Sequence, residues 1–284
     1  MANVEWANPE MLGVNFAPKD FAETLDGGQS FCWYKNADNS YCGVFGNDVA
    51  KLFLDEKNCV NFCAPKNANA KKLKERLLNY LDTNRDYEKI RQQLFAVGDK
   101  CLNERLAQQP TLRILRQDIN ETIISFICSS SKRIVQIKQC VSLLRKTFGE
   151  EICGGFYTLP TFELLANADM QSLKDCKLGF RAAYLKKTAQ KIVDDNFDTG
   201  QLLKMPYKDA KAYLVSLSGI GEKVADCILL FGAHRFEAFP VDTWIIKSMK
   251  SLYGMEKPAD IRRFAAEHFG ENAGFAQQIL FAAA

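Results

Sequence analysis

The sequence predicts an α+β protein, in which a small N-terminal domain with an antiparallel β-sheet is followed by a mostly α-helical domain. Up to about residue 66, glycines separate short runs that are rich in β-forming residues. From Ala68 onward, apolar residues recur every three or four positions, which is the spacing of one face of a helix. The length of 284 residues corresponds to about two domains. We place the first domain at 1–85 and the second at 86–284.

Three strands are predicted in the N-terminal domain, at 29–34, 40–45 and 49–54. Aromatic and β-branched side chains, which fit the pleated surface of a sheet, are frequent in these runs. The polar segment 36–39 between the first two strands has the composition of a turn. Strands joined by such a short turn pair in antiparallel fashion.

The first two helical segments follow from apolar residues that recur in steps of three and four. One face is formed by Leu73, Leu77 and Leu81. The next pattern consists of Tyr87, Ile90, Leu94, Val97 and Cys101.

A third pattern predicts a helix between two end signals. Its apolar face consists of Ile134, Ile137, Val141 and Leu144. Ser131 is expected to cap its N-terminus, and Gly149 to end it. Glycine and proline divide the remaining chain into shorter predicted helices, at 161–168, 171–175, 181–196, 208–217, 222–232, 243–253, 258–269 and 272–283.

The composition excludes several classes of protein. With 47% hydrophobic and 25% charged residues, the chain is unlike a disordered, collagen-like or low-complexity protein. No apolar run approaches the roughly 20 residues of a membrane helix, and the first residues lack the pattern of a secretion signal. The ten cysteines include no Cys-x-x-Cys pair, which favours free thiols in a reducing compartment. A net charge of +3 permits binding to nucleic acid.

The segment 217–227, Leu-Ser-Gly-Ile-Gly-Glu-Lys-Val-Ala-Asp-Cys, predicts a helical hairpin. Between its two helices, Gly219 and Gly221 lack a Cβ atom, so another backbone can approach closely. Their N–H groups and the positive end of the following helix form a site for an anion such as phosphate. A plain turn between helices is the alternative interpretation. Because no strand precedes the glycines, a dinucleotide-binding fold is disfavoured.

Lys223 and Asp242 are the candidate catalytic residues. Lys223 lies in the first turn of the second hairpin helix, where the helix dipole disfavours a cation. Such a position, like burial, favours the neutral amine, which is a nucleophile. Asp242 is expected to be the N-cap of the helix 243–253, and capping alone would account for it. Its ionised carboxylate could also support a developing cation in front of it.

These segments resemble the helix-hairpin-helix, Gly/Pro-Asp superfamily of DNA glycosylases, and within it the 8-oxoguanine DNA glycosylases. The most specific similarity lies in the hairpin and in the segment 239–242, Phe-Pro-Val-Asp. It covers nearly the whole chain, because further segments match in order, at 28–33, 112–118, 125–130, 178–184 and 275–281. The resemblance implies a helix-hairpin-helix glycosylase domain behind the β-rich domain. It also implies base excision repair by a bifunctional DNA glycosylase and AP lyase.

The resemblance assigns roles to both catalytic candidates. Lys223 would attack C1′ of the damaged nucleotide, expel the base and form a Schiff base that permits β-elimination of the 3′ phosphate. Asp242 would stabilise the oxocarbenium-like sugar and help to position the nucleophile. The base must leave the duplex to be reached, so a pocket has to receive it.

Five residues are implied to form the pocket for the flipped 8-oxoguanine. Phe281 and Cys227 would sandwich the base, and Cys227 shares a helical face with Lys223. Gln277 would read the Watson–Crick edge, and Trp244 would lie beside the site near a phosphate. The carbonyl of Gly28 would accept a hydrogen bond from N7–H of 8-oxoguanine, whereas normal guanine presents a lone pair there.

Further DNA contacts are implied for Ser131, Gln136, Phe180 and Arg181. These residues stand where eukaryotic relatives carry an Asn, a Tyr and two Arg that fill the gap and read the orphan cytosine, and only Arg181 is retained. The departures, with Trp244 in place of a His, resemble the bacterial branch and predict relaxed opposite-base specificity. Gly219 and Gly221 would bind DNA phosphates. The basic pairs at 132–133 and 186–187 are also expected to contact DNA.

No cofactor is expected, although a structural cation at the hairpin is compatible with the resemblance. No cysteine follows Cys227, so the iron–sulfur cluster of the endonuclease III and adenine-glycosylase branches is not expected. The isolated His234 and His268 do not form a zinc motif. The expected partner is double-stranded DNA containing oxidised guanine, bound by a monomer without membrane association. The expected location is the bacterial cytoplasm or, in a eukaryote, the nucleus.

Two other functions stay open at this point. One is a helix-hairpin-helix glycosylase for alkylated bases, although such relatives generally lack a lysine at the position of Lys223. The other is a non-catalytic DNA-binding protein that uses the hairpin only for phosphates. Such a protein has no need of both Lys223 and Asp242.

Overall fold

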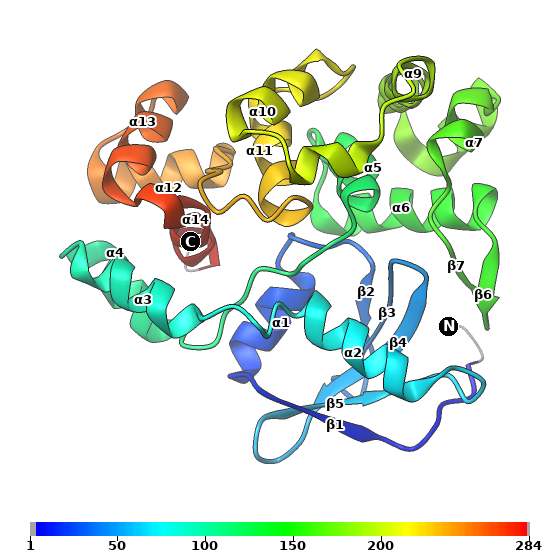
Figure 1. Cartoon of the computed structure of the whole chain (residues 1–284), viewed down its shortest axis with the longest axis horizontal. Coiled ribbons are helices and arrows are strands. Elements are labelled where there is room, and N and C mark those ends of the chain that lie inside the picture. The colour runs from blue at the N-terminus through cyan, green and yellow to red at the C-terminus, as the bar shows by residue number, and fades with distance from the viewer. Residues whose placement is uncertain (1–3, 283–284) are drawn as a thin grey trace.

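The computed structural model describes residues 4–282, which form a sheet domain and a helical domain (Figure 1). Five strands make one antiparallel sheet in the order β1-β5-β4-β3-β2. They are β1 (Glu10–Asn15), β2 (Trp33–Lys35), β3 (Tyr41–Phe45), β4 (Asp48–Leu54) and β5 (Cys59–Cys63). The predicted α+β fold class is confirmed.

The sheet differs from the prediction in two respects. β2 begins at Trp33 rather than at residue 29, because the side chain of Gln29 is bonded to the backbone of Arg113 and Leu115 instead. β1 and β5 are additional to the predicted strands. They pair across about fifty residues of chain, with Glu10 opposite Phe62. Short strands that pair over such a distance leave little signal in a local sequence window.

The helices account for most of the remaining chain. They are α1 (Pro18–Asp26), α2 (Ala70–Tyr80), α3 (Tyr87–Ala96), α4 (Lys100–Gln108), α5 (Ile119–Ser129), α6 (Ile134–Phe148), α7 (Phe162–Asn167), α8 (Met170–Leu173), α9 (Arg181–Asp194), α10 (Tyr207–Ser216), α11 (Glu222–Phe231), α12 (Thr243–Tyr253), α13 (Pro258–His268) and α14 (Ala273–Ala282). A small two-stranded sheet, β6 (Glu151–Cys153) with β7 (Phe156–Tyr157), follows α6. A π-helical turn at Lys174–Leu178 and 3₁₀ turns at Thr199–Leu203 and Gly270–Asn272 complete the elements.

The structure confirms the predicted helices with local corrections. The pattern from Tyr87 to Cys101 is divided into two helices at Gly98, whose φ of +77° suits glycine. α6 ends at Gly149 as predicted, but its N-cap is Arg133 rather than Ser131. Ser131 has a φ of +53°, and the Gln136 side chain accepts the Arg133 backbone N–H at 2.9 Å. α1 and α5 are additional, and the predicted end of the last helix at residue 283 lies outside the described residues.

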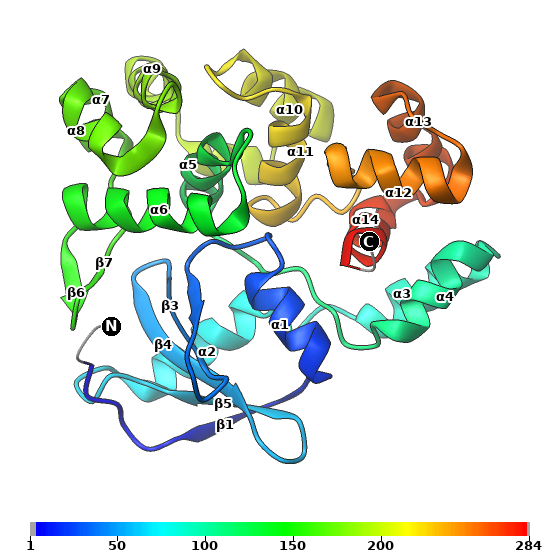
Figure 2. The same ribbon diagram turned by 180° about the vertical axis from the view of Figure 1, so that it is seen from behind.

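Two hydrophobic cores divide the described chain. The sheet and α2 enclose one, which includes Trp33 and the predicted face of Leu73, Leu77 and Leu81. The second joins the helices from α3 to α14. Most of the first core precedes Leu81 and most of the second follows Tyr87, but Phe31 and Cys32 belong to the second core and Leu115 to the first. Figures 1 and 2 show α6 lying between the sheet and the helices α7 and α9.

Buried polar contacts join the sheet domain to the helices. Lys138 of α6 donates to the Trp33 carbonyl at 2.6 Å and contacts Asp26 at the end of α1. Nearby, Arg145 of α6 lies 3.1 Å from Glu121 of α5. The thiol of Cys32 donates to the same carboxylate. Because a buried charge is stabilised only when it is paired, these contacts determine how the loop 27–32 lies against α6.

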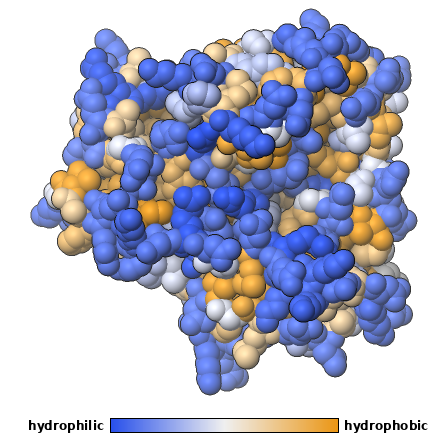
Figure 3. Space-filling model, viewed as in Figure 1, coloured by the Kyte–Doolittle hydropathy of each residue, from blue (hydrophilic) through white to orange (hydrophobic). Residues whose placement is uncertain are grey.

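The surface and the cysteines agree with the sequence analysis. Hydrophilic side chains cover most of the face shown in Figure 3, and hydrophobic ones form small, separate patches. All ten cysteines are free. Between residues 4 and 282, no helix is both long and apolar enough to cross a bilayer.

Candidate active site

A cavity of about 1050 Å³ lies where the sheet domain, α6, the hairpin and α12 meet. The loop after α1, the end of α5, the beginning of α6, the hairpin, the beginning of α12 and the end of α14 line it. It brings together nine of the thirteen predicted site residues: Gly28, Ser131, Gln136, Gly219, Gly221, Lys223, Asp242, Trp244 and Phe281. Cys227, Gln277, Phe180 and Arg181 do not line it.

The hairpin has the predicted form, and one of its glycines is required by the packing. α10 ends at Ser216 and α11 begins at Glu222. Gly219 has a φ of +81°, and a Cβ atom there would lie 2.6 Å from Cβ of Tyr184. Gly221 has open space around it. The Thr188 hydroxyl donates to the Ser218 carbonyl at 2.8 Å, so α9 holds the turn in place.

A buried ion pair that was not predicted from the sequence holds the two hairpin helices together. Asp226 of α11 is completely buried, and it accepts from the Tyr207 hydroxyl at 2.6 Å and lies 2.9 Å from Lys211 of α10. Lys211 also lies 2.9 Å from Glu222. The spacing of four residues between Tyr207 and Lys211, and between Glu222 and Asp226, is a signal that could have indicated this contact.

Lys223 is half-buried at the beginning of α11, and its surroundings are mainly apolar. Its Nζ atom lies 5.5 Å from the centre of the Phe126 ring, which closes one side of the cavity. Cys227 lies one turn further along the helix and is buried. Burial raises the pKa of the Cys227 thiol to about 11, and the positive charge of Lys223 beside it opposes the rise. The thiol is therefore neutral at pH 7, and the Lys223 side chain lines the cavity whereas that of Cys227 does not.

Asp242 caps α12 as predicted and also faces the cavity. One carboxylate oxygen, Oδ1, accepts the backbone N–H groups of Trp244 at 3.0 Å and Ile245 at 2.8 Å. These two bonds orient the carboxylate and leave its second oxygen without a hydrogen bond among the described residues. The charge of Asp242 is also near Cys227, since it raises the pKa of that thiol. Asp242 and Lys223 thus line one cavity from two different helix ends.

Gly28 is brought to the cavity by its neighbour in the chain. Gln29 is almost completely buried, and its carbonyl accepts from the Gln117 side chain at 2.6 Å. Gly28 itself has a φ of +107° and faces Ile134 at the beginning of α6, where a Cβ atom would approach to 3.2 Å. A side chain at this position would be strained and would also narrow the cavity.

The two predicted aromatic residues, Trp244 and Phe281, line the cavity, whereas Gln277 does not. The Trp244 side chain is 56% exposed, and the Lys247 ammonium lies 4.8 Å from its ring centre. Phe281 is half-buried at the end of α14. Gln277 is buried, and its side-chain oxygen accepts from Gln278 at 2.7 Å. The Gln277 side chain does not line the cavity.

The predicted DNA contacts fall into two groups. Ser131 and Gln136 line the cavity. Phe180 is 58% exposed outside it, and the Arg181 guanidinium lies 4.2 Å from the Phe180 ring centre. Arg181 is buried and donates to the carbonyls of Ser130 and Leu178. The structure therefore does not bring the Arg181 guanidinium to the cavity wall.

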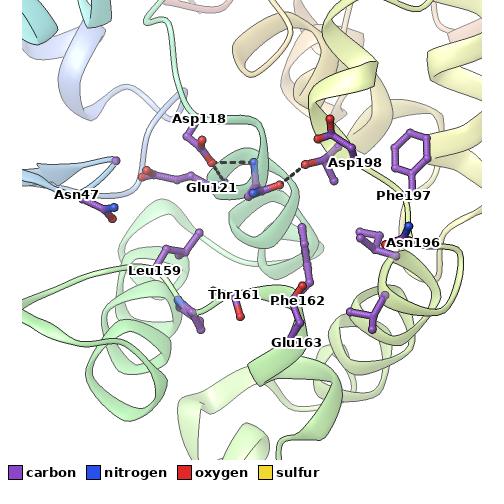
Figure 4. A pocket seen from close by; sticks show the side chains of 16 residues that line it. Asn47, Asp118, Glu121, Leu159, Thr161, Phe162, Glu163, Asn196, Phe197 and Asp198 are labelled. Atoms are coloured by element: carbon purple, nitrogen blue, oxygen red, sulfur yellow. Dashed lines mark hydrogen bonds between the residues drawn. The ribbon is translucent and has the colours of Figure 1, made fainter.

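A second cavity, of about 660 Å³, lies at the other end of α5 and has a different chemistry (Figure 4). Four carboxylates are among its lining residues, and Lys, Arg, His and Cys are absent from them: Asp118, Glu121, Glu163 and Asp198. Asp118 caps α5, and Asp198 caps the 3₁₀ turn at Thr199–Leu203. Glu121 pairs with Arg145. A cavity with this charge repels a phosphate.

No group of three or more His, Cys, Asp and Glu side chains within residues 4–282 is arranged to hold a metal ion. Neither cavity therefore has a recognisable metal centre in the part of the chain that the structure describes.

Comparisons with known proteins agree with this arrangement. The N-terminal domain of 8-oxoguanine DNA glycosylases matches residues 11–123, and the HhH-GPD superfamily of base excision DNA repair proteins matches residues 124–270. A probable N-glycosylase/DNA lyase of Methanothermobacter thermautotrophicus is 33% identical to this chain over 208 residues. The matched region covers 64% of this chain and 66% of that protein, which is just under two thirds of the relative's length. The N-glycosylase/DNA lyase of Saccharomyces cerevisiae is 31% identical over 266 residues, covering 85% of this chain and 70% of that protein.

A solved structure resembles the whole fold. It is the apo form of the 8-oxoguanine glycosylase/lyase of Clostridium acetobutylicum, which is 32% identical to this chain. The TM-score is 0.86, and the similarity covers 99% of this chain and 98% of that one.

Proposed function

This chain belongs to the 8-oxoguanine DNA glycosylases of the HhH-GPD superfamily of base excision DNA repair proteins, and we propose that it removes 8-oxoguanine from duplex DNA through a Schiff base on Lys223. The observation that carries the proposal is the position of Lys223 and Asp242 on the wall of one cavity, at the beginnings of two helices. In the hairpin beside them, the backbone N–H groups of Gly219 and Gly221 form no hydrogen bond with residues 4–282, so they can donate to a phosphate. Duplex DNA with an oxidised guanine is the proposed substrate, and a monomer is the proposed active form.

The first step is displacement of the base. The neutral Lys223 amine forms a bond from Nζ to C1′ as the bond between C1′ and the base nitrogen breaks. The bonding electrons leave with the base, which then takes up a proton. Positive charge develops on the sugar during this step, and the Asp242 carboxylate, held by two backbone N–H bonds, stabilises it.

Strand cleavage follows from the same covalent bond. The ammonium formed at Nζ then loses one proton. Its lone pair forms the C1′=Nζ bond of a protonated imine as the C1′–O4′ bond of the sugar ring breaks, and O4′ takes up a proton. This imine acidifies C2′–H, so removal of that proton expels the 3′ phosphate by β-elimination. Water later hydrolyses the imine and frees Lys223. One lysine thereby supports both the glycosylase and the lyase reaction.

Recognition of the base is assigned to the walls of the cavity. The Gly28 carbonyl accepts N7–H of 8-oxoguanine and faces the N7 lone pair of guanine, so two acceptors meet and guanine is rejected. Phe281 supplies an apolar surface for one face of the base. The cavity of about 1050 Å³ leaves room for a complete nucleotide.

Borohydride trapping on a duplex with one 8-oxoguanine tests the proposal. A Schiff base is reduced to a stable amine, so we expect a covalent protein–DNA complex together with release of the base. Undamaged guanine and 3-methyladenine in the same sequence serve as controls. Base release from the alkylated duplex without trapping would instead identify a glycosylase for alkylated bases. Binding without release or trapping would identify a non-catalytic hairpin protein.

A further inference from the structure

We propose that Lys138, a buried residue of α6 outside the cavity, is a positioning residue that makes the protein prefer 8-oxoguanine to guanine. The inference rests on the proposed function, in which the Gly28 carbonyl distinguishes the two bases. Lys138 holds the two residues that flank the loop 27–32, and Gly28 lies in this loop. It therefore acts on the base through the backbone of the loop.

The direction of the Gly28 carbonyl is not fixed by a bond of its own. Gly27 and Gly28 follow each other, and glycine has the least restricted backbone of all residues. The Gly28 carbonyl accepts no hydrogen bond from residues 4–282. It is thus available to a ligand, and where it points depends on how the chain is held on either side.

The chain after Gly28 is held by the segment 113–117. The side chain of Gln29 donates to the Arg113 carbonyl at 2.9 Å and accepts the Leu115 N–H at 2.8 Å. The Gln29 carbonyl in turn accepts from the Gln117 side chain at 2.6 Å. These three bonds fix the position of one neighbour of Gly28.

The chain before Gly28 is held by Lys138. Its ammonium contacts the carboxylate of Asp26, the last residue of α1, and donates to the Trp33 carbonyl at 2.6 Å. Only 8% of Lys138 is exposed. Ile134, one turn earlier on the same face of α6, faces Gly28 itself. One face of α6 therefore meets the loop at two successive turns.

The lysine at this buried position is explained by its bonds rather than by its packing. An ammonium group inside a protein is costly unless it is paired. Compared with an apolar side chain of similar volume, a buried ion pair adds little stability. Methionine fills about the same space but bonds neither Asp26 nor the Trp33 carbonyl. The contribution of Lys138 is therefore to fix the geometry of the loop.

The choice between the two bases depends on this geometry. A carbonyl in line with N7 accepts N7–H of 8-oxoguanine and repels the N7 lone pair of guanine. If the carbonyl turns away, both effects weaken. The attack of Lys223 on C1′ and the later β-elimination do not use the Gly28 carbonyl. Lys138 thus affects the selection of the base but not strand cleavage at a site that has already lost its base.

The test compares two duplexes of the same sequence. One contains 8-oxoguanine opposite cytosine, and the other contains a preformed abasic site opposite cytosine. We expect Lys138→Met to lower single-turnover excision of 8-oxoguanine about 10- to 100-fold, because a misplacement of about 1 Å can cost as much as 100-fold. Strand cleavage and borohydride trapping at the abasic site should keep the wild-type rate. A general loss of folded protein would lower both reactions together.

Two further variants separate loop positioning from folding. Asp26→Ala removes one partner of Lys138 and should also slow excision selectively, by a smaller factor. The double variant should be no slower than Lys138→Met, since both changes act through one contact. Lys51→Met is the matched control: it removes an ion pair of 2.8 Å with Asp38 from the same sheet domain, outside the loop and the cavity, and should leave both rates unchanged. Thermal denaturation checks that each variant is folded.

The inference is overturned if folded Lys138→Met excises 8-oxoguanine at the normal rate, or if it loses both reactions equally. Should Lys138→Met not fold, normal excision by Asp26→Ala overturns it instead. Failure of the proposed function is distinct, because the wild-type protein would then release no 8-oxoguanine. In that case, equilibrium binding to the lesion-containing and undamaged duplexes decides: Lys138→Met should weaken the preference for the lesion, and an unchanged preference contradicts the inference.

Discussion

The two cavities at the two ends of α5 differ in how their polar groups are used. At the C-terminal end, Lys223 and Arg133 face the cavity without an ion-pair partner within residues 4–282. At the N-terminal end, the carboxylates of Asp118 and Asp198 accept backbone N–H groups in caps. Glu121 is bonded to Arg145 and Cys32.

The comparison shows that size alone does not identify a reactive site. Both cavities could hold a ligand, but charged groups in the second one already stabilise helix ends and a buried ion pair. The signs of the charges that line the two cavities also differ. Three cations and one carboxylate line the first cavity, namely Lys132, Arg133, Lys223 and Asp242, whereas the charged residues of the second are all acidic. Only the first attracts a DNA backbone.

The largest expected effect distinguishes the two cavities directly. Lys223→Gln should reduce excision by about 10⁴-fold or more and abolish borohydride trapping, because the amide is not a nucleophile. The protein should still fold and bind lesion DNA. Glu163→Gln, in the second cavity, is the control and should excise at the normal rate. Single-turnover assays measure both, and appreciable excision by folded Lys223→Gln would remove this residue from the role of nucleophile.

The second largest loss of excision is expected when one of two capping aspartates is replaced, and the two aspartates lie at different cavities. Asp242 and Asp118 both accept two backbone N–H groups at a helix N-terminus. Asparagine also caps, so Asp242→Asn and Asp118→Asn should both keep the fold. Excision should slow about 10²-fold or more in Asp242→Asn alone, through loss of charge stabilisation. A normal rate in Asp242→Asn, with unchanged melting, would reduce Asp242 to a cap.

A smaller effect concerns the base opposite the lesion. Ser131 is short, Gln136 is occupied in a cap, and Phe180 has no hydroxyl to read a base edge. We therefore expect the preference for cytosine over adenine to stay below about 1–3 kcal/mol, the value of one good base contact. Single-turnover excision opposite each of the four bases, at fixed salt, measures it. A preference of several thousandfold would contradict this prediction.

The smallest effect should be confined to stability. Asp118→Ala removes both capping bonds from α5 and should cost about 1 kcal/mol of unfolding free energy. Because the second cavity is not the reactive one, the excision rate at a temperature well below melting should not change. Thermal denaturation and a single-turnover assay on the same sample check the two expectations. A clear loss of excision would show that the two ends of α5 are coupled.

The sequence by itself determined those features of the molecule that arise from interactions between residues close together in the chain. The spacing of apolar residues predicted α6, and glycines at 219 and 221 predicted the hairpin. Asp242 could be recognised as an N-cap because a cap involves residues only two or three positions apart. These features require no knowledge of what packs against them.

Tertiary structure alone decided which polar groups are buried and which meet at the cavity. The residues next to Arg181 and Gln277 in the sequence do not indicate whether these side chains face a ligand or the protein interior. In the structure both are buried and form hydrogen bonds inside the protein. Gly28 reaches α6 because Gln29 is bonded to a segment more than eighty residues away. The pairing of β1 with β5 is equally remote. Contacts of this kind arise only when distant segments pack together, and a periodic pattern in the sequence does not contain them.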